Sequence, residues 1–203
     1  MKKQVVNYET LLKITNAISH SRDPEEVVVM TTESVAHAMN VKGCTIFLIN
    51  RRTEELEVAS SFGLSKDYLN KGPVSAMHSI AESLSEGPVA IGDVSDDPRI
   101  QYPEEARKEG IASILSVPMT TGGKTIGALR VYTAEPAEFN MDDVNFVQAV
   151  ANMTAMALDM ARHYKGLKDS IEILKLMRDP RMYQSKKRKS AKGTFRKAPE
   201  ARP

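Results

Sequence analysis

The sequence predicts an α+β fold: a central antiparallel sheet of about five to six strands, N- and C-terminal helices on one face, and short helices and loops over the other. Two pairs of β-rich runs, at residues 44–62 and 113–133, predict the sheet because short turn-forming connections separate the members of each pair. Apolar residues at steps of three and four from residue 146 to residue 174 predict one long final helix.

Two helices open the chain. Residues 8–18 place apolar side chains at spacings of three and four, which indicates a first helix that ends near His20. The second helix begins where Asp23 precedes Pro24 and two glutamates, a sequence typical of a capped helix start, and it continues to Asn40.

The strand pairs follow from local sequence. Residues 44–49 are apolar throughout, which predicts a central strand covered on both faces and paired with residues 56–62. Residues 113–121 and 124–133 are joined by Gly122 and Gly123, and both positions can take the positive φ that a two-residue hairpin turn needs. Residues 88–91 form a further short apolar run.

Short helices are predicted between these strands, at residues 65–70, 76–84 and 103–109, with a break at Gly72 and Pro73. The third begins with proline and two glutamates and ends at Gly110, which can supply a left-handed residue. Helices laid over one face of an open sheet would leave a concave, mostly apolar cleft for a small ligand.

The final helix begins at Asn140 and meets no proline before Pro180. At 1.5 Å per residue, residues 140–178 would span about 58 Å, longer than a domain of this size is wide. Its last apolar residues would then face water in a monomer, so we expect a parallel coiled-coil homodimer. The alternative is a helix that breaks at Gly166, with residues 167–178 folded back.

Composition excludes several classes of protein. The 203 residues contain no apolar run of the ~20 residues that cross a bilayer, and the N-terminus lacks a signal-peptide pattern. We therefore expect a cytoplasmic protein that does not contact a membrane. Cys44 is the single cysteine, which excludes an internal disulfide and a cysteine-based zinc site, and its apolar neighbours predict a buried, unreactive side chain.

The net charge of +2 conceals an uneven distribution. Residues 181–203 carry nine basic side chains and one acidic side chain, whereas the rest of the chain has a net charge of −6. This tail holds too few apolar residues to offset the entropy of ordering, so we interpret it as disordered. A solubilising extension is one interpretation, and weak binding to nucleic acid or another polyanion is the other.

Alternation along the strands selects the residues that would line the cleft. We expect Ser116, Arg130 and Tyr132 to face it, with Thr45 and Phe47 as neighbours. His78, on the covering helix, is a further candidate contact, although a single histidine is more simply an exposed or hydrogen-bonded side chain than a metal ligand. We predict no catalytic residue and no metal site.

Arg130 is the strongest of these candidates. A guanidinium in a central strand costs several kcal/mol unless it is paired, and a carboxylate or phosphate ligand would supply a bidentate partner. Pairing with an internal acid such as Asp93 or Glu82 is equally consistent with the sequence. Asp93, Asp96 and Asp97 otherwise look like turn formers beside Pro98.

Together these segments resemble the GAF domain, a small-molecule-binding relative of the PAS fold, over residues 5–165. The residues that carry the resemblance are the helices at 12–19 and 24–39, the hairpin at 44–64, and residues 87–131 with Asp97-Pro98-Arg99, SILSVPM at 113–119 and IGAL at 126–129, followed by residues 139–161. The resemblance implies an N-terminal helix at 1–20, a GAF-like domain at 21–165, a helical extension at 166–180 and the tail at 181–203.

Departures from the family pattern narrow the range of possible ligands. No cysteine lies between residues 64 and 112, which argues against an attached linear tetrapyrrole, and a lone Cys44 cannot run the disulfide cycle of members that reduce methionine sulfoxide. The Asn-Lys-Phe-Asp-Glu signature of cyclic-nucleotide-binding members is missing. The sequence assigns no cofactor and does not identify the ligand.

The leading hypothesis is a non-catalytic sensor or adaptor for signal transduction. It would bind a small ligand, with an anion favoured, and act on a partner signalling protein through a dimeric C-terminal helix. One competing hypothesis is a structural dimerisation module with an empty cleft, and another is nucleic-acid binding through residues 181–203 alone.

Overall fold

The structure is a computed structural model that describes residues 11–16, 23–75, 87–95 and 97–178. The chain divides into two compact units, Met1–Ala161 and Arg162–Pro203. The first unit holds the sheet and the helices packed on it, and the helix α6 (Met141–Arg178) runs from the first unit into the second. The candidate site lies in the first unit.

The sheet has six antiparallel strands in the order β3-β2-β1-β6-β5-β4, which confirms the predicted α+β fold. Its strands are β1 (Gly43–Asn50), β2 (Glu55–Phe62), β3 (Val74–Ser75), β4 (Val89–Ile91), β5 (Ser113–Thr121) and β6 (Lys124–Thr133). Gly122 and Gly123 have φ of 55° and 72°, as the predicted hairpin turn requires. The apolar β1 and β6 occupy the centre of the sheet, where both faces are covered.

One strand differs from the sequence prediction. Val74 and Ser75 pair with Leu56 and Glu55 to form β3 at the sheet edge, directly after the predicted break at Gly72 and Pro73. A two-residue strand is defined by its partner rather than by its own sequence, so no local pattern indicates it.

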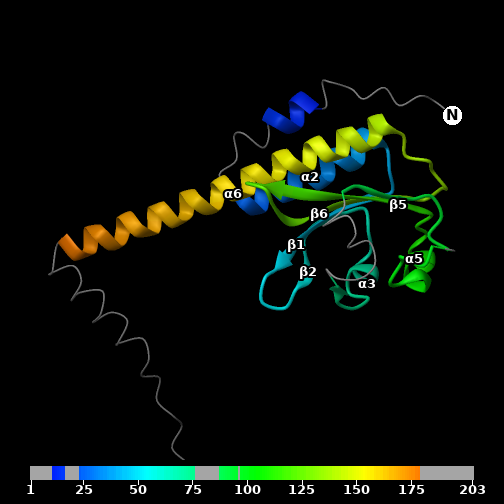
Figure 1. The fold of residues 1–203 in the computed structure, drawn as a ribbon, viewed down its shortest axis with the longest axis horizontal. Helices are drawn as coiled ribbons and strands as arrows, with labels where there is room; N and C mark the ends of the chain where they lie inside the picture. Colours follow the sequence, from blue (N-terminus) through cyan, green and yellow to red (C-terminus); the bar gives the residue numbers. More distant parts are fainter. Residues whose placement is uncertain (1–10, 17–22, 76–86, 96, 179–203) are drawn as a thin grey trace, which may run out of the picture. The chain divides into compact units, whose positions relative to one another are not determined.

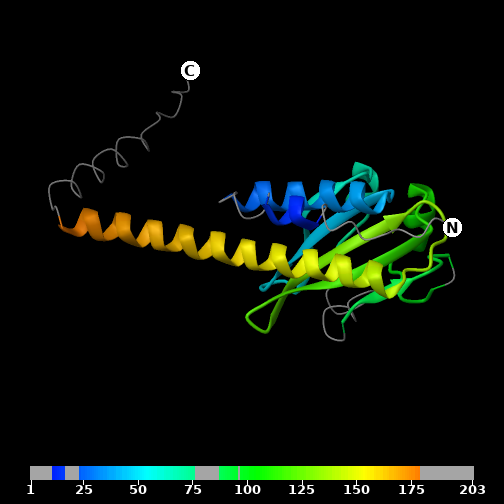
Figure 2. The ribbon, with the colours of Figure 1, turned by 90° about the horizontal axis from the view of Figure 1, so that it is seen from above.

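Helices α2 (Pro24–Met39) and α6 cover one face of the sheet (Figure 1). Asp23 caps α2 by accepting a hydrogen bond from the Glu25 amide at 3.0 Å, and Asn40 ends it in the left-handed conformation. Figure 2 shows α2 and the first part of α6 side by side above the strands, where the Thr31 and Thr154 hydroxyls lie 3.2 Å apart.

This layer forms the larger core. Its buried side chains include Val27 and Val35 of α2, Val147 and Val150 of α6, and alternate residues of the central strands, among them Ile46, Leu115, Val117, Leu129 and Val131. Residues 11–16 are helical, and Ile14 is buried in the same core. The rest of the predicted first helix lies outside the described residues.

The short helices α3 (Lys66–Leu69) and α5 (Pro103–Glu109) lie on the opposite side of the sheet (Figure 1), as predicted. Ser65 caps α3, and Gly110 ends α5 with φ of 71°. A smaller core joins them to the sheet and includes Tyr68, Ala106, Ile114 and Tyr132. The helix predicted at residues 76–84 lies outside the described residues.

Helix α6 continues through Gly166 to Arg178, so the alternative in which the helix breaks at Gly166 is wrong. In its second part, Tyr164, Leu167, Ile171 and Leu174 are each at least half exposed. Among the helices of the described residues, none is long and apolar enough to cross a membrane.

Candidate ligand site

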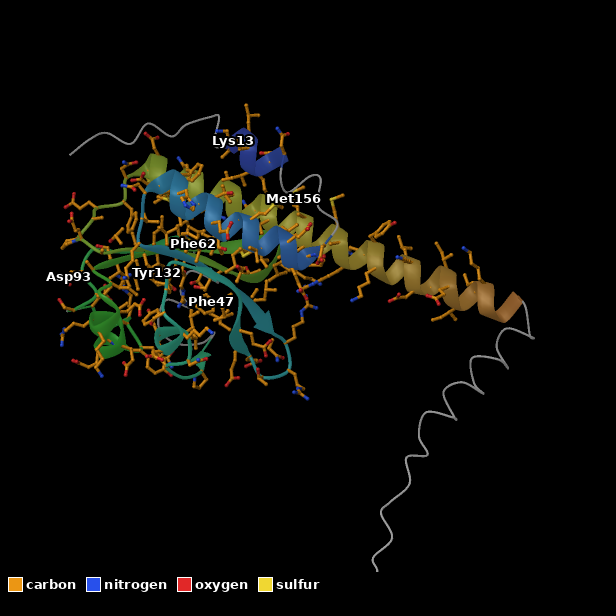
Figure 3. The ribbon with its side chains drawn as sticks, turned by 180° about the vertical axis from the view of Figure 1, so that it is seen from behind. Lys13, Phe47, Phe62, Asp93, Tyr132 and Met156 are labelled. Carbon is orange, nitrogen blue, oxygen red and sulfur yellow. The ribbon has the colours of Figure 1, made fainter. Side chains whose placement is uncertain are left out.

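Five of the predicted site residues lie on the face of the sheet that α3 and α5 cover. Strand register brings them together, because Arg130 of β6 is paired with Thr45 of β1 on one side and with Ser116 of β5 on the other. Figure 3 shows Phe47 and Tyr132 beneath the strands, on the side away from α2 and α6. The sixth predicted residue, His78, lies outside the described residues.

Arg130 is the central feature of this face. Its side chain is 6% exposed, its Nε lies 3.4 Å from Ser116 Oγ, and its guanidinium carbon lies 4.8 Å from the centroid of the Phe47 ring. Its Nη2 atom is buried and has no hydrogen-bond partner. The ion pairs among the described residues join Asp97 to Arg99 and Glu104 to Arg107, so none of them neutralises Arg130.

Asp93, one of the two acids that the sequence suggested as an internal partner of Arg130, forms its hydrogen bonds with another residue. The Asp93 carboxylate accepts hydrogen bonds from the Ser95 amide at 2.9 Å and the Ser95 hydroxyl at 2.6 Å, and these bonds lower its pKa. Pairing of Asp93 with Arg130 is therefore wrong, and Asp93 lies at the margin of the sheet in Figure 3. The other suggested partner, Glu82, lies outside the described residues.

Asp97 forms a turn, as predicted, and Asp96 lies outside the described residues. The Asp97 carboxylate accepts hydrogen bonds from the Arg99 amide and guanidinium, which lower the pKa of Asp97. Side chains that are bonded within one turn are not aimed at a ligand.

A second cation, Lys71, joins the site without any sequence signal. Its ammonium lies 3.7 Å from the centroid of the Tyr68 ring and donates a hydrogen bond to the Tyr68 carbonyl at 3.1 Å. Burial, together with the nearby charge of Arg130, lowers the pKa of Lys71 to about 8. A lysine before Gly72 and Pro73 resembles any exposed loop residue in the sequence, so only the fold identifies it.

Lys71 and Arg130 line one cavity of about 20 Å³ between the sheet and the covering segments. Ile114, Tyr68 and Tyr102 form part of its wall, and the Tyr102 hydroxyl donates a hydrogen bond to the Pro73 carbonyl at 2.9 Å. A polar cavity needs about 10–15 Å³ to hold one water molecule, so this one has room for a small polar group. Both of its cationic side chains face that space.

The hydroxyl residues beside Arg130 are already paired within the protein. Thr45 Oγ1 lies 3.1 Å from Ser61 Oγ, and Tyr132 is hydrogen bonded by Thr45 and Arg130. Burial raises the pKa of Tyr132, while the Arg130 charge acts against this rise. The buried donors left for a ligand therefore belong mainly to Arg130.

The described residues offer no reactive thiol and no metal-binding cluster. Cys44 is fully buried, and burial raises the pKa of its thiol. Within the described part of the chain, no three histidine, cysteine, aspartate or glutamate side chains gather where they could hold a metal ion.

Comparison with known proteins decides the family. The family model described as the GAF domain matches residues 21–159. The chain belongs to the GAF domain family. GAF domains are sensory, small-molecule-binding domains of signalling proteins, and the resemblance predicted from the sequence is thereby confirmed.

Solved structures of similar fold include regulatory and enzymatic proteins. The GAF domain of a phosphoenolpyruvate-protein phosphotransferase from Coxiella burnetii superposes with a TM-score of 0.72 at 17% identity, over 81% of this chain and 99% of that one. The free methionine-R-sulfoxide reductase of Neisseria meningitidis superposes with a TM-score of 0.67 at 19% identity, over 77% and 90%. GAF domains are mostly regulatory, and this reductase is a neighbour that is an enzyme.

A curated relative is the formate hydrogenlyase transcriptional activator of Salmonella typhimurium, which is 22% identical over 168 residues. The match covers 79% of this chain and 24% of the relative. The GAF domain described here therefore spans about a quarter of the length of the curated relatives it matches.

Proposed function

We propose that this GAF domain is a non-catalytic sensor that binds a small anion beside Arg130 and signals through a homodimeric C-terminal helix. The observation that carries the proposal is the buried guanidinium of Arg130, whose Nη2 has no hydrogen-bond partner and which no described acid neutralises. Burial of an unpaired charge is costly, and a site for an anion is a physical reason to keep one.

The electrostatics of the cavity favour an anion over a neutral or cationic ligand. Lys71 and Arg130 both line the cavity, and the charge of Arg130 contributes to the lowered pKa of Lys71, so the two cations repel each other. A carboxylate or oxyanion would remove this repulsion and accept charge-assisted hydrogen bonds from Arg130. Binding would also raise the pKa of Lys71, so we expect affinity to fall as the pH rises above about 8.

The size of the cavity favours a compact ligand. A space of about 20 Å³ is little more than one water molecule needs, so an anion of a few heavy atoms could enter with movement of the cavity walls, whereas a nucleotide or a tetrapyrrole could not. Small carboxylates and inorganic oxyanions are the ligand classes that combine this size with the required charge.

The absence of a reactive thiol supports a non-catalytic role. A sulfoxide reductase needs a thiolate and a resolving partner, whereas this chain holds one cysteine, which is buried and has a raised pKa. The Cys44 side chain lies in the core shared by the sheet and the α2–α6 layer rather than beside Arg130.

The output of the sensor would be α6. Its exposed apolar residues Tyr164, Leu167, Ile171 and Leu174 continue a 3.5-residue repeat, which a second copy of the helix would cover. A ligand that favours one arrangement of the paired helices would shift the population toward that arrangement. A partner signalling protein bound to the helices would respond to this change. The curated relatives are named as transcriptional activators, and a regulator of this kind is consistent with such a role.

The test is calorimetric titration of the full chain at pH 7 with formate, acetate, nitrate and inorganic phosphate. Formate is included because the curated relatives carry it in their name. We expect one of these anions to bind, and we expect Arg130→Gln to weaken that binding at least tenfold. Arg107→Gln, which removes an exposed arginine on α5, is the matched control and should bind normally. Binding that survives Arg130→Gln, or no binding by any anion, would contradict the proposal.

Two alternatives have their own signatures. A structural dimerisation module would dimerise through α6 and show no change in melting temperature with any anion. Nucleic-acid binding through residues 181–203 would give DNA affinity that falls steeply with salt and disappears when those residues are deleted.

A further inference from the structure

We propose that Lys71 is a site of reversible carbamylation by carbon dioxide, and that Arg130 holds the carbamate. This inference rests on the anion site proposed above and names one anion for it, formed from a side chain of the protein itself. The observations that carry it are the shared cavity, the unpartnered Arg130 Nη2 and the position of the Lys71 nitrogen.

The geometry leaves the Lys71 nitrogen available for reaction. It is half-buried and held over the Tyr68 ring at 3.7 Å, with one hydrogen bond to the Tyr68 carbonyl at 3.1 Å. A neutral amine can keep that donor bond through one of its two protons and still present its lone pair to the cavity. Lys71 and Arg130 line the same cavity.

The charges around Lys71 determine how much neutral amine exists. Burial and Arg130 lower its pKa to about 8, from the ordinary 10.5, while the carboxylates of Glu105 and Glu109 on α5 act in the opposite direction. Tyr68 and Tyr102 also face the ammonium, at 3.7 and 5.9 Å from their ring centroids. At pH 8 about half of Lys71 is therefore unprotonated, roughly 100-fold more than for an ordinary lysine.

The reaction itself is balanced without any further reagent. The lone pair of neutral Nζ attacks the carbon of carbon dioxide, a C–N bond forms, and one C=O π bond breaks with its electrons passing to oxygen. The nitrogen then loses one proton to solvent. The products are a lysine carbamate of charge −1 and a proton, and reversal of these steps releases carbon dioxide.

Arg130 would hold the product. Carbamylation replaces a cation that repels Arg130 with a carboxylate that can pair with it, and the Nη2 donors that lack a partner gain one. The added group consists of three heavy atoms, which is the size that a cavity of about 20 Å³ can receive with small movements of its walls. Because formation needs neutral Nζ and releases a proton, occupancy should rise with both pH and carbon dioxide.

The experiment uses the full chain equilibrated with ¹³C-labelled bicarbonate and carbon dioxide at pH 8. Triethyloxonium trapping, proteolysis and mass spectrometry then locate the labelled carbamate, and peptide mapping separates it from the α-amino group, whose ordinary pKa is also about 8. We expect at least tenfold higher occupancy at Lys71 than at the exposed Lys66 and Lys108. Equal labelling of these three lysines would overturn the proposal.

Variants test the role of Arg130. Lys71→Arg keeps a cation beside Tyr68 but cannot form the carbamate, so the signal should vanish, whereas Lys108→Arg should leave it unchanged. Arg130→Gln should lower carbamate occupancy at Lys71 at least tenfold. If Arg130→Gln does not fold, Arg130→Lys is used in its place. Occupancy that is unchanged in a folded Arg130 variant would overturn the proposal.

A failure of the carbamate proposal can be distinguished from a failure of the anion-binding proposal. Titration with formate and phosphate in degassed buffer tests the anion site without carbon dioxide. Anion binding with no labelled Lys71 would overturn the carbamate and leave the sensor proposal standing. Labelled Lys71 that depends on Arg130, with no binding of free anions, would support the carbamate and overturn the binding of a diffusible anion.

Discussion

The guanidinium carbon of Arg130 lies 4.8 Å from the centroid of the Phe47 ring, so an aromatic face supports a buried cation that no described acid pairs. The β1-β6 register explains the contact, because Thr45 is opposite Arg130 and Phe47 is opposite Ala128, two residues along each strand on the same face. The ring keeps the charge in place without neutralising it, which leaves the guanidinium able to bind an anion.

A double-mutant cycle measures this contact. We expect Phe47→Leu and Arg130→Gln to be coupled by about 1–2 kcal/mol in urea unfolding, because a cation–π contact shielded from water is stronger than an exposed one. Additive effects, within about 0.3 kcal/mol, would show that Phe47 only fills space.

Gly127 should tolerate no side chain. A Cβ at this position in β6 would lie 2.0 Å from the Phe47 carbonyl oxygen, a backbone atom that cannot move without disrupting β1. We expect Gly127→Ala to lower the free energy of unfolding by about 3 kcal/mol or more, measured by denaturant unfolding. Gly166→Ala is the control, since no atom lies within 4 Å of its added Cβ, and it should increase helicity by circular dichroism.

Lys71 should make stability depend on alkaline pH. Its pKa is about 8 in the folded protein and about 10.5 when unfolded, so the unfolded state binds more protons between these values and stability rises with pH there. Cys44 and the buried Tyr68 and Tyr132 have raised pKa values, so they lower stability above their ordinary pKa values of 9 and 10. Urea unfolding should therefore show a rise from pH 8 to 9, and Lys71→Met should abolish it.

The exposed apolar residues of the 3.5-residue repeat in α6 should hold two copies of the chain together. Leu167→Glu with Leu174→Glu would place charges on the face of the 3.5-residue repeat, and we expect sedimentation equilibrium to show a monomer where the wild type is a dimer. Ile173→Glu is a matched control, because Ile173 is also exposed but lies off this repeat. A monomeric wild type at micromolar concentration would contradict the proposed output.

Cys44 should be inert in the folded protein. Because the thiol is fully buried and its pKa is raised, a thiol reagent should label it at least about 100-fold more slowly in buffer than in denaturant. Fast labelling of the folded chain would instead indicate an accessible thiolate and reopen a redox role.

Features that depend on local chemistry could be predicted from the sequence. The capped start at Asp23 and Pro24, the hairpin at Gly122 and Gly123, and the end of α5 at Gly110 each rest on residues that adjoin one another. Alternation along single strands also placed Ser116 and Arg130 on one face, because side chains in a strand point to opposite faces in turn.

Features that depend on distant partners were decided only by the tertiary structure. Strand β3 forms because β2 offers an edge with which it can pair. Lys71 lines the cavity because the neighbouring Tyr68 of α3 packs against Tyr132 of β6, and no spacing in the sequence indicates this contact. The sequence determined that a guanidinium lies in a central strand. Whether an acid reaches it depends on how loops pack across the sheet, and the fold turned Asp93 toward Ser95 instead.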